Sequence, residues 1–381
     1  MLRLDRRRAA RLDWRGASIG GFPLDSGRQG AFVFHGSWRD FAPIAFTNLL
    51  LTIVTLGIYR FWATTRERRY LWGQTQFIDD RLEWTGTGKE LFIGFLLVLV
   101  LFGIPFLFLQ FGAQALIFQG YAEIAGALGF VAFLAIFYLA GIARYRALRY
   151  RLSRTYWHGI RGGSDDQGWG YGLSYMWKTF ISYIPIGLLI PWAMMALWNQ
   201  RWSAMSFGPF AFRAHGSASA TFKRFLLFYL LPFAVAGAAG VVALSMMPGF
   251  LNAERSGDAI AAGFLAIFLV VLGFYILLGL IALAFYAKFF RVAVSGLSLG
   301  DLDFRFSAST KQWLMLFLGD VVLVICTLGI GAIFLSYRHW AFFIRHMEAT
   351  GEIDFNQLTQ STTRAPGQGE GLLDAFDVGA I

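Results

Sequence analysis

The sequence predicts a polytopic membrane protein built from α-helices. Hydrophobic residues make up 57% of the 381 residues and charged residues only 15%, whereas soluble domains contain about 45–50% and about 25%. The mean hydropathy is +0.55. A formal charge of +10 would suggest nucleic acid as the partner of a soluble chain, but the long apolar runs place this chain against a bilayer. The partners that we expect are anionic phospholipid headgroups and not nucleic acid.

The two ends of the chain differ in composition from its middle. Residues 1–30 carry seven arginines with no apolar core between them, so we expect no secretory signal peptide and a basic, mobile arm. Residues 359–381 are polar and contain glycine, and we expect a flexible tail there. A single membrane domain should occupy residues 31–358.

Four apolar stretches are long enough to cross a bilayer, which requires about 20 residues. The stretch that begins at Gly126 reaches this length when residues 121–125 are added to it. The sequence therefore predicts four full transmembrane helices, over Leu91–Phe111, Gly126–Ile142, Phe225–Met247 and Ala261–Phe285.

Three further apolar stretches are short and broken. Broken backbone at membrane depth is tolerated only where protein or a water-filled cavity satisfies its hydrogen bonds. We therefore expect re-entrant helical hairpins; the alternative is that short helices span a locally thinned bilayer. The stretches are Pro43–Tyr59, Thr179–Leu197 and Trp313–Leu335, and the residues that break them are Gly57, Pro185, Gly187 and Gly329.

The distribution of Lys and Arg favours the re-entrant arrangement. Seven crossings would place 16 basic residues on one side of the membrane and 17 on the other. Re-entrant stretches leave only the connectors 112–125 and 248–260 outside, with Arg255 as their single basic residue. Because basic residues concentrate on the cytoplasmic side, we expect both termini in the cytoplasm.

A tetrapeptide occurs twice, as Thr55-Leu56-Gly57-Ile58 and as Thr327-Leu328-Gly329-Ile330. Nine residues before the breaking glycine of each short stretch stands a polar residue, Asn48, Lys178 or Asp320. Ionisable groups within membrane segments are costly and often mark a path for ions or substrates. We expect these three at equivalent positions, with Lys178 and Asp320 neutralising each other; alternatively, Lys178 extends to the interface.

Segments rich in aromatic and basic residues follow the apolar stretches. Their composition is typical of amphipathic helices at the level of the lipid headgroups. The residues that we expect at the lipid interface are Trp62, Arg66, Arg68, Arg69, Trp72, Arg149, Arg151, Trp157, Arg201, Trp202, Lys288, Arg291, Arg338, Trp340 and Arg345.

Short alternating segments flank these helices and are typical of strands. They lie at residues 32–35, 82–85, 210–213, 302–306 and 353–355. Because lipid cannot satisfy unpaired strand edges, we expect them to pair with one another on the cytoplasmic face. The inferred repeat unit of strands, hairpin, surface helices and two spans occupies about residues 31–157 and 158–300, with a half unit at 301–358.

Motifs across residues 31–358 resemble the YjgN-like family of bacterial inner-membrane proteins, which has no assigned function. The third unit departs from the family pattern at Gly331-Ala332, so a role of Tyr59 need not transfer to Tyr337. The resemblance implies a multi-pass inner-membrane protein, without a reaction, ligand or catalytic residue. The segments that carry it include Phe34-His35-Gly36-Ser37, Thr55–Tyr59 and Arg66–Tyr70.

Turns explain two patterns that resemble reactive sites. Gly296–Gly300 matches G-x-S-x-G, but that motif needs a strand before it and a helix after it, and the sequence predicts the reverse order. His35, His158 and His215 each precede glycine, with no carboxylate or thiol at ligand spacing. A single cysteine, Cys326, excludes an intrachain disulfide framework and a Cys-based zinc site. We expect no enzyme activity, no cofactor and no metal.

Two functions fit these expectations. The first is a transporter- or channel-like protein with a polar centre between the re-entrant hairpins. The alternative is a structural or lipid-organising protein that binds anionic phospholipid through its basic aromatic surface helices. A hydrated passage joining Asn48, Lys178 and Asp320 would favour transport, and a filled centre would favour the alternative.

Overall fold

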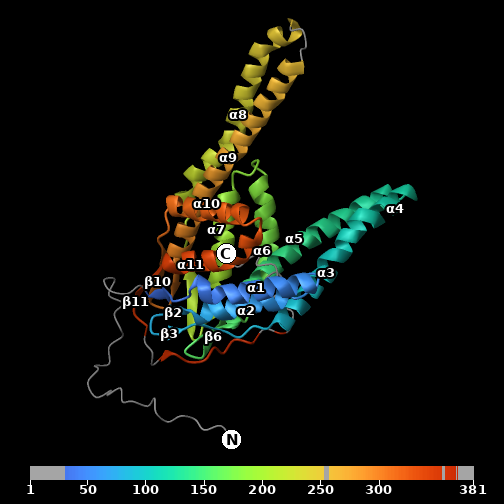
Figure 1. Cartoon of the computed structure of the whole chain (residues 1–381). Helices are drawn as coiled ribbons and strands as arrows, with labels where there is room; N and C mark the ends of the chain where they lie inside the picture. Colours follow the sequence, from blue (N-terminus) through green and yellow to red (C-terminus); the bar gives the residue numbers. More distant parts are fainter. Residues whose placement is uncertain (1–30, 253–256, 354–356, 366, 368–381) are drawn as a thin grey trace, which may run out of the picture.

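The computed structural model describes residues 31–252, 257–353, 357–365 and 367. The predicted basic arm, residues 1–30, and residues 368–381 of the predicted tail lie outside the described residues. Figure 1 shows two long helical hairpins that leave a common body in diverging directions. This body consists of the strands and three pairs of shorter helices.

Among the described residues, four helical stretches are long and apolar enough to span a membrane, as the sequence predicts. Their bounds are Gly88–Phe118, Ala122–Ser153, Ser219–Gly237 and Ile267–Ser295. Apolar side chains such as Leu99 and Phe130 are exposed along them, which suits contact with lipid. The helices are α3 (Gly88–Leu107), the π-helical turn η1 (Phe108–Gly112), α4 (Ala113–Phe118), α5 (Ala122–Ser153), α8 (Ser219–Asn252) and α9 (Gly257–Ser295).

The three short helix pairs occupy the positions of the three broken stretches. Ser37 caps the first pair and Ser309 the third, because each side chain accepts a hydrogen bond from the backbone N–H three residues later. The first pair is α1 (Trp38–Val54) with α2 (Arg60–Gly73), and the second is α6 (Trp169–Tyr183) with α7 (Ile190–Ser203). The third is α10 (Thr310–Cys326) with the 3-10 turn η2 (Ile330–Phe334) and α11 (Leu335–Arg345).

The same backbone turn closes all three pairs. Its dipeptides Leu56-Gly57, Ile186-Gly187 and Leu328-Gly329 have φ angles between +50° and +91°. In the first and third turns the glycine N–H donates to the carbonyl five residues earlier, at 2.7 and 2.8 Å, the pattern of a Schellman helix end. Glycine adopts a φ near +90° without the strain that a Cβ would cause. The glycines predicted to break each stretch therefore lie in the turn that follows the first helix of each pair.

The fold is mostly helical, as predicted, but it is not purely α-helical, because antiparallel strands form much of the body. Eight strands pair in the order β11-β10-β9-β8-β7-β6-β5-β4 and three in the order β1-β2-β3, curving into a half-barrel. Each strand has two to five residues, so none forms a long pattern in the sequence. The strands are β1 (Phe32–Phe34), β2 (Thr75–Phe77), β3 (Asp80–Arg81), β4 (Glu83–Trp84), β5 (Thr155–Trp157), β6 (Ile160–Gly163), β7 (Ser206–Phe207), β8 (Phe210–Ala214), β9 (Leu297–Leu299), β10 (Leu302–Phe306) and β11 (Met347–Gly351).

Four of the five predicted strand segments contain a strand, three of them in the eight-stranded sheet and one, β1, in the three-stranded sheet. The last strand, β11, comes before the predicted segment 353–355, of which residues 354–355 lie outside the described residues. His158 and Gly159 connect β5 to β6 with φ angles of +51° and +71°, as a two-residue hairpin turn requires. This geometry confirms the interpretation of His158-Gly159 as turn residues.

Aromatic packing joins the first helix pair to the last. The Trp72 ring stacks on Trp340 with centroids 4.0 Å apart, and the Tyr337 hydroxyl donates to the Gly36 carbonyl at 3.0 Å. Segments nearly 270 residues apart therefore lie side by side. The larger buried core, which links the sheet to the helices, includes Tyr145, Trp157, Met195, Leu302 and Phe306.

Part of the predicted flexible tail is held against the body. Arg161 on β6 donates to the Thr363 carbonyl, and the Gln360 amide donates to the Gly159 carbonyl at 2.8 Å. The Arg364 N–H donates to Asp165 at 3.1 Å. Residues 360–364 thus follow β6 and the loop after it.

Candidate functional site

Asn48 lies on α1 and is bonded to α2. Its side chain is buried, with 3% of its surface exposed. The amide donates to the Ala63 carbonyl at 3.2 Å and to Glu67 at 3.4 Å, and the amide oxygen accepts from Arg66 at 3.2 Å. The first predicted intramembrane polar residue is therefore satisfied within its own helix pair.

Asp320 lies on α10 and is bonded to α11 in the matching way. Its carboxylate accepts from Arg338 Nε at 2.6 Å, and its other oxygen lies 2.7 Å from His339 Nε2. These partners follow Asp320 by 18 and 19 residues, the spacings that separate Asn48 from Arg66 and Glu67. The first and third helix pairs therefore each have a polar contact between their two helices, at equivalent positions.

Lys178 lies on α6 and is bonded to α7. Its ammonium group donates to Gln200 at 2.7 Å, and Gln200 in turn donates to Ser174 at 3.0 Å. The predicted pairing of Lys178 with Asp320 is wrong: each charge has partners inside its own helix pair. Local partners satisfy both groups, so no contact between the pairs is needed to offset their burial.

The structure also contains a cavity that the sequence did not reveal. It measures about 310 Å³ and lies between α5, α6, α7 and α9. Tyr171, Tyr175, Thr179 and Tyr183 recur at intervals of four on one face of α6, and this polar stripe is the signal that could have indicated it. The lining residues are Arg144, Tyr171, Tyr175, Thr179, Ser182, Tyr183, Ile190, Ala193, Met194, Leu197, Trp198, Arg201 and Phe289.

Two arginines give the cavity a positive end. Arg201 is buried, with 5% of its surface exposed. Burial lowers the pKa of its guanidinium; Tyr171 opposes this shift, and the Arg144 and Arg151 charges add to it. The described lining residues include no carboxylate. Burial also raises the pKa of Tyr171, so its hydroxyl stays protonated and able to donate.

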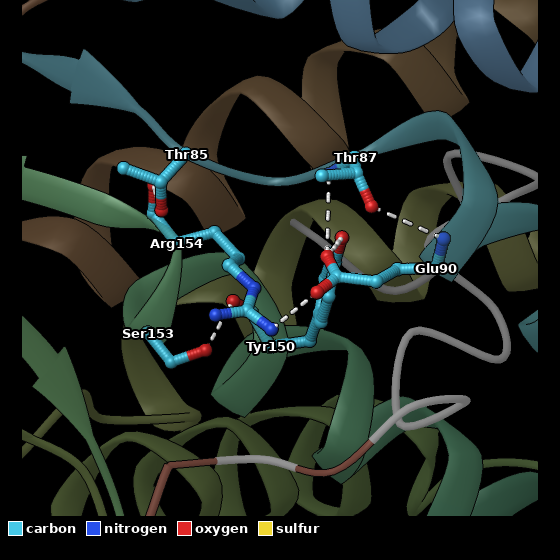
Figure 2. A network of polar contacts seen from close by, with 6 residues as sticks. All are labelled: Thr85, Thr87, Glu90, Tyr150, Ser153 and Arg154. Carbon is cyan, nitrogen blue, oxygen red and sulfur yellow. Dashed lines mark hydrogen bonds and ion pairs between the residues drawn. The ribbon is translucent and has the colours of Figure 1, made fainter.

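A polar network fixes the base of the first long hairpin (Figure 2). Glu90 on α3 accepts from the Tyr150 hydroxyl at 2.9 Å and from Arg154 at 2.5 Å, both on α5. Thr87 and Glu90 form a reciprocal cap at the start of α3. Arg154 also links to the strand segment through its carbonyl, which accepts from Thr85. Each of these groups is hydrogen-bonded either to the backbone or to a side chain of a neighbouring element. We therefore assign the network a structural role.

The residues predicted at the lipid interface divide by burial. Trp62, Arg69 and Arg345 are exposed, and most of the others are half-buried. Five lie inside the protein instead: Arg68, Trp72, Arg149, Trp157 and Arg201.

Specific partners explain this burial. Arg68 lies over the Trp84 ring at 5.0 Å, and Arg149 donates to the Asp166 carbonyl at 3.2 Å. The Trp157 N–H donates to the Phe77 carbonyl at 3.0 Å. A basic or aromatic residue near the membrane can therefore serve the protein core as well as the lipid surface.

The G-x-S-x-G match and the His-Gly pairs are the two patterns that resemble reactive sites. Leu297–Leu299 of the G-x-S-x-G match form β9, which follows a helix, so the order is the reverse of a nucleophile elbow. Within the described residues, no group of three His, Cys, Asp or Glu side chains could hold a metal ion.

The four candidate spans and the strand-containing body define a multi-pass α-helical membrane protein. The chain belongs to the family of bacterial proteins of unknown function DUF898, whose family profile matches residues 29–375. Together with the YjgN relatives described next, this match confirms the resemblance to YjgN-like proteins.

The similar curated proteins are named for their membrane. The inner membrane protein YjgN of Salmonella typhimurium is 22% identical over 370 residues, which cover 86% of this chain and 90% of that protein. The inner membrane protein YjgN of Escherichia coli K12 is 27% identical over 160 residues, which cover 42% and 36%. No solved structure is significantly similar to this chain.

Proposed function

We propose that this protein organises lipid in the cytoplasmic leaflet of the bacterial inner membrane, with the three short helix pairs entering that leaflet as wedges. The observation that carries the proposal is the exposure of the three turns. Leu56, Ile186 and Leu328 are 94%, 77% and 93% exposed in left-handed backbone conformations. Removing such a side chain from water is favourable by about 1.5–3 kcal/mol. Insertion of the three turns into lipid would provide this stabilisation.

Contacts with the long helices support different depths for two of the wedges. Phe180, near the end of α6, packs on Phe133 and Phe137, with ring centroids 5.9 and 5.1 Å away. These two residues lie in the N-terminal half of α5, well inside a candidate span. Phe61, next to the first turn, packs on Phe95 near the start of α3 at 5.1 Å. The α6–α7 turn would therefore reach deeper than the α1–α2 turn.

The three polar residues also support this function over a shared transport path. A path formed jointly by Asn48, Lys178 and Asp320 would require their side chains to face a common space. Each is instead bonded to the second helix of its own pair. We propose that these bonds hold the two helices of each wedge together. We also propose that both termini lie on the cytoplasmic side.

Depth-dependent quenching tests the wedges. Single cysteines at Leu56, Ile186 and Leu328 in a Cys326→Ala background would carry an environment-sensitive fluorophore in lipid vesicles. We expect quenching by spin labels on lipid acyl chains, with the probe at Ile186 deepest. A probe at Glu348, on an exposed position of β11, is the control and should respond to a water-soluble quencher. Three turn probes that behave like Glu348 would overturn the proposal.

Anion transport is the second candidate function. The cavity beside the second helix pair, with its two arginines, is the observation in its favour. Uptake of labelled phosphate into vesicles containing the protein, at a rate that falls with Arg144→Gln and not with Arg213→Gln, would favour transport over lipid organisation. Arg213 is an exposed arginine on β8.

A further inference from the structure

Arg144 lines the cavity between α5, α6, α7 and α9. Its guanidinium lies over the Tyr175 ring, 4.9 Å from the centroid. Within the described part of the chain it makes no hydrogen bond and no ion pair. A guanidinium carries five N–H donors in a planar fork. This group therefore has free donor capacity at the cavity wall.

A second positive charge faces the same space. Arg201 is buried on α7 and lines the same cavity as Arg144. Two like charges beside a partly enclosed space disfavour each other unless an anion lies between them. The described lining residues include no carboxylate, and an anion bound between the two guanidinium groups would reduce their mutual repulsion.

Hydroxyl groups complete the polar end. Tyr171 and Tyr175 project from α6 into the same lining as the two arginines. Planar guanidinium groups together with hydroxyl donors are typical of phosphate recognition. A carboxylate would use only two acceptor atoms, whereas a phosphate offers enough oxygens for two arginines and the hydroxyls.

The α7 side of the cavity is apolar and extends along the helix pair toward its turn, where Ser182 and Tyr183 of α6 face it from the other side. Arg201 stands near the end of α7 that joins the sheet, and Ile190 near the end at the turn. Met194 and Leu197 lie between them in the lining. Tyr183, at the outer end of α6, is 61% exposed. A ligand with its charge at Arg201 would direct its apolar part toward the exposed turn.

We propose that this cavity binds the phosphate ester of an amphiphilic anion, with the phosphate between Arg144 and Arg201 and the apolar part along α7. The phosphate could belong to an anionic phospholipid or to a free phosphate ester. The volume of about 310 Å³ accommodates a headgroup with a few carbons and not whole acyl chains. Only the lipid source depends on the wedge placement proposed above; a free phosphate ester could enter without it.

Thermal unfolding of the full-length protein in a neutral detergent tests the proposal. The probes are dihexanoyl phosphatidylglycerol and glycerol phosphate. The zwitterionic lipid dihexanoyl phosphatidylcholine is the control. About 150 mM salt would screen exposed charges. We expect a saturable rise in the unfolding temperature with a phosphate-bearing anion, and at least a tenfold weaker apparent affinity in Arg144→Gln. Arg144 is only half-buried, so this variant should fold.

Matched variants and the choice of probe separate the outcomes. Arg213→Gln removes an exposed guanidinium from β8 and should leave binding unchanged. Stabilisation by phosphatidylglycerol alone assigns a lipid ligand, and stabilisation by glycerol phosphate assigns a free ester. No saturable effect of either probe, or equal losses in Arg144→Gln and Arg213→Gln, would overturn the site. None of these variants alters the three turns, so failure of the wedges would leave this result standing.

Discussion

Asp320 and Asn48 occupy matching places in two helix pairs, and their chemistry differs. Asn48 is a neutral amide that both donates to α2 and accepts from it. Asp320 is an acceptor with 13% of its side chain exposed, and it is bonded to Arg338 and His339. In the Asp320–Arg338 contact both partners are ionised, whereas in the contacts of Asn48 with Arg66 and Glu67 only one partner is, and charge strengthens a hydrogen bond. The third helix pair should therefore depend more strongly on its polar contact than the first.

A double-mutant cycle tests this assignment. We expect Asp320→Asn and Arg338→Gln each to lower the free energy of unfolding, with a coupling of about 1 kcal/mol. The value is modest because Arg338 is 34% exposed and solvent screens the pair. Lys178→Met combined with Asp320→Asn is the control, and its effects should add within about 0.5 kcal/mol. Unfolding in mixed detergent micelles would measure these quantities, and coupling of Lys178 to Asp320 would contradict the observed partners.

At the scale of the elements, the turn is what the three helix pairs share. The tetrapeptide repeated at Gly57 and Gly329 corresponds to a shared set of hydrogen bonds. In both turns a threonine hydroxyl, of Thr55 or Thr327, accepts a backbone N–H four residues later. The middle turn has Pro185 in place of this threonine and keeps the same pair of positive φ angles. Conformation is therefore preserved where the sequence differs.

Backbone strain at one turn gives a direct measurement. A methyl group added at Gly329 would meet no atom within 4 Å, so crowding contributes nothing to the effect of Gly329→Ala. The φ of +91° should lower the free energy of unfolding by about 1–2 kcal/mol. Gly170→Ala, in α6 with equally open surroundings, is the control and should be neutral or stabilising by up to about 1 kcal/mol. Equal effects of the two substitutions would show that the turn carries no such constraint.

At the scale of the whole molecule, the first and last helix pairs close on each other through Trp72 and Trp340. The Trp340 N–H donates to Thr75 at 2.9 Å, and the Trp72 N–H donates to Thr155 at 2.9 Å. Thr75 belongs to β2 of the three-stranded sheet and Thr155 to β5 of the eight-stranded sheet, so each bond ties a helix pair to a sheet. The two long hairpins extend from this common base (Figure 1).

Orientation is the prediction that belongs to this scale. Placing the sheet and the short helix pairs on one side leaves the loop at Gln119 on the other, where few basic residues occur. In a Cys326→Ala background, Gln119→Cys should react with a membrane-impermeant reagent on intact cells. Glu348→Cys should react only after the membrane is permeabilised. Labelling of Glu348→Cys in intact cells would reverse the proposed orientation.

The sequence by itself determined the features that depend on neighbouring residues. Runs of apolar side chains identify the four spans, because the thickness of a bilayer sets the length of a helix that crosses it. Gly57, Gly187 and Gly329 identify the helix ends, because a left-handed φ selects glycine locally. The offset of nine residues located Asn48, Lys178 and Asp320, although not their partners.

Only the tertiary structure decided which residues meet. Arg69 and Arg201 look alike in the sequence, each within a basic aromatic segment. Arg69 is exposed, whereas Arg201 lines a cavity. The difference arises because α5, α6, α7 and α9 pack around Arg201 and not around Arg69. The strands depend in the same way on partners far away in the chain, since each is too short to be stable alone. Burial and pairing are properties of the assembled fold, and no single segment encodes them.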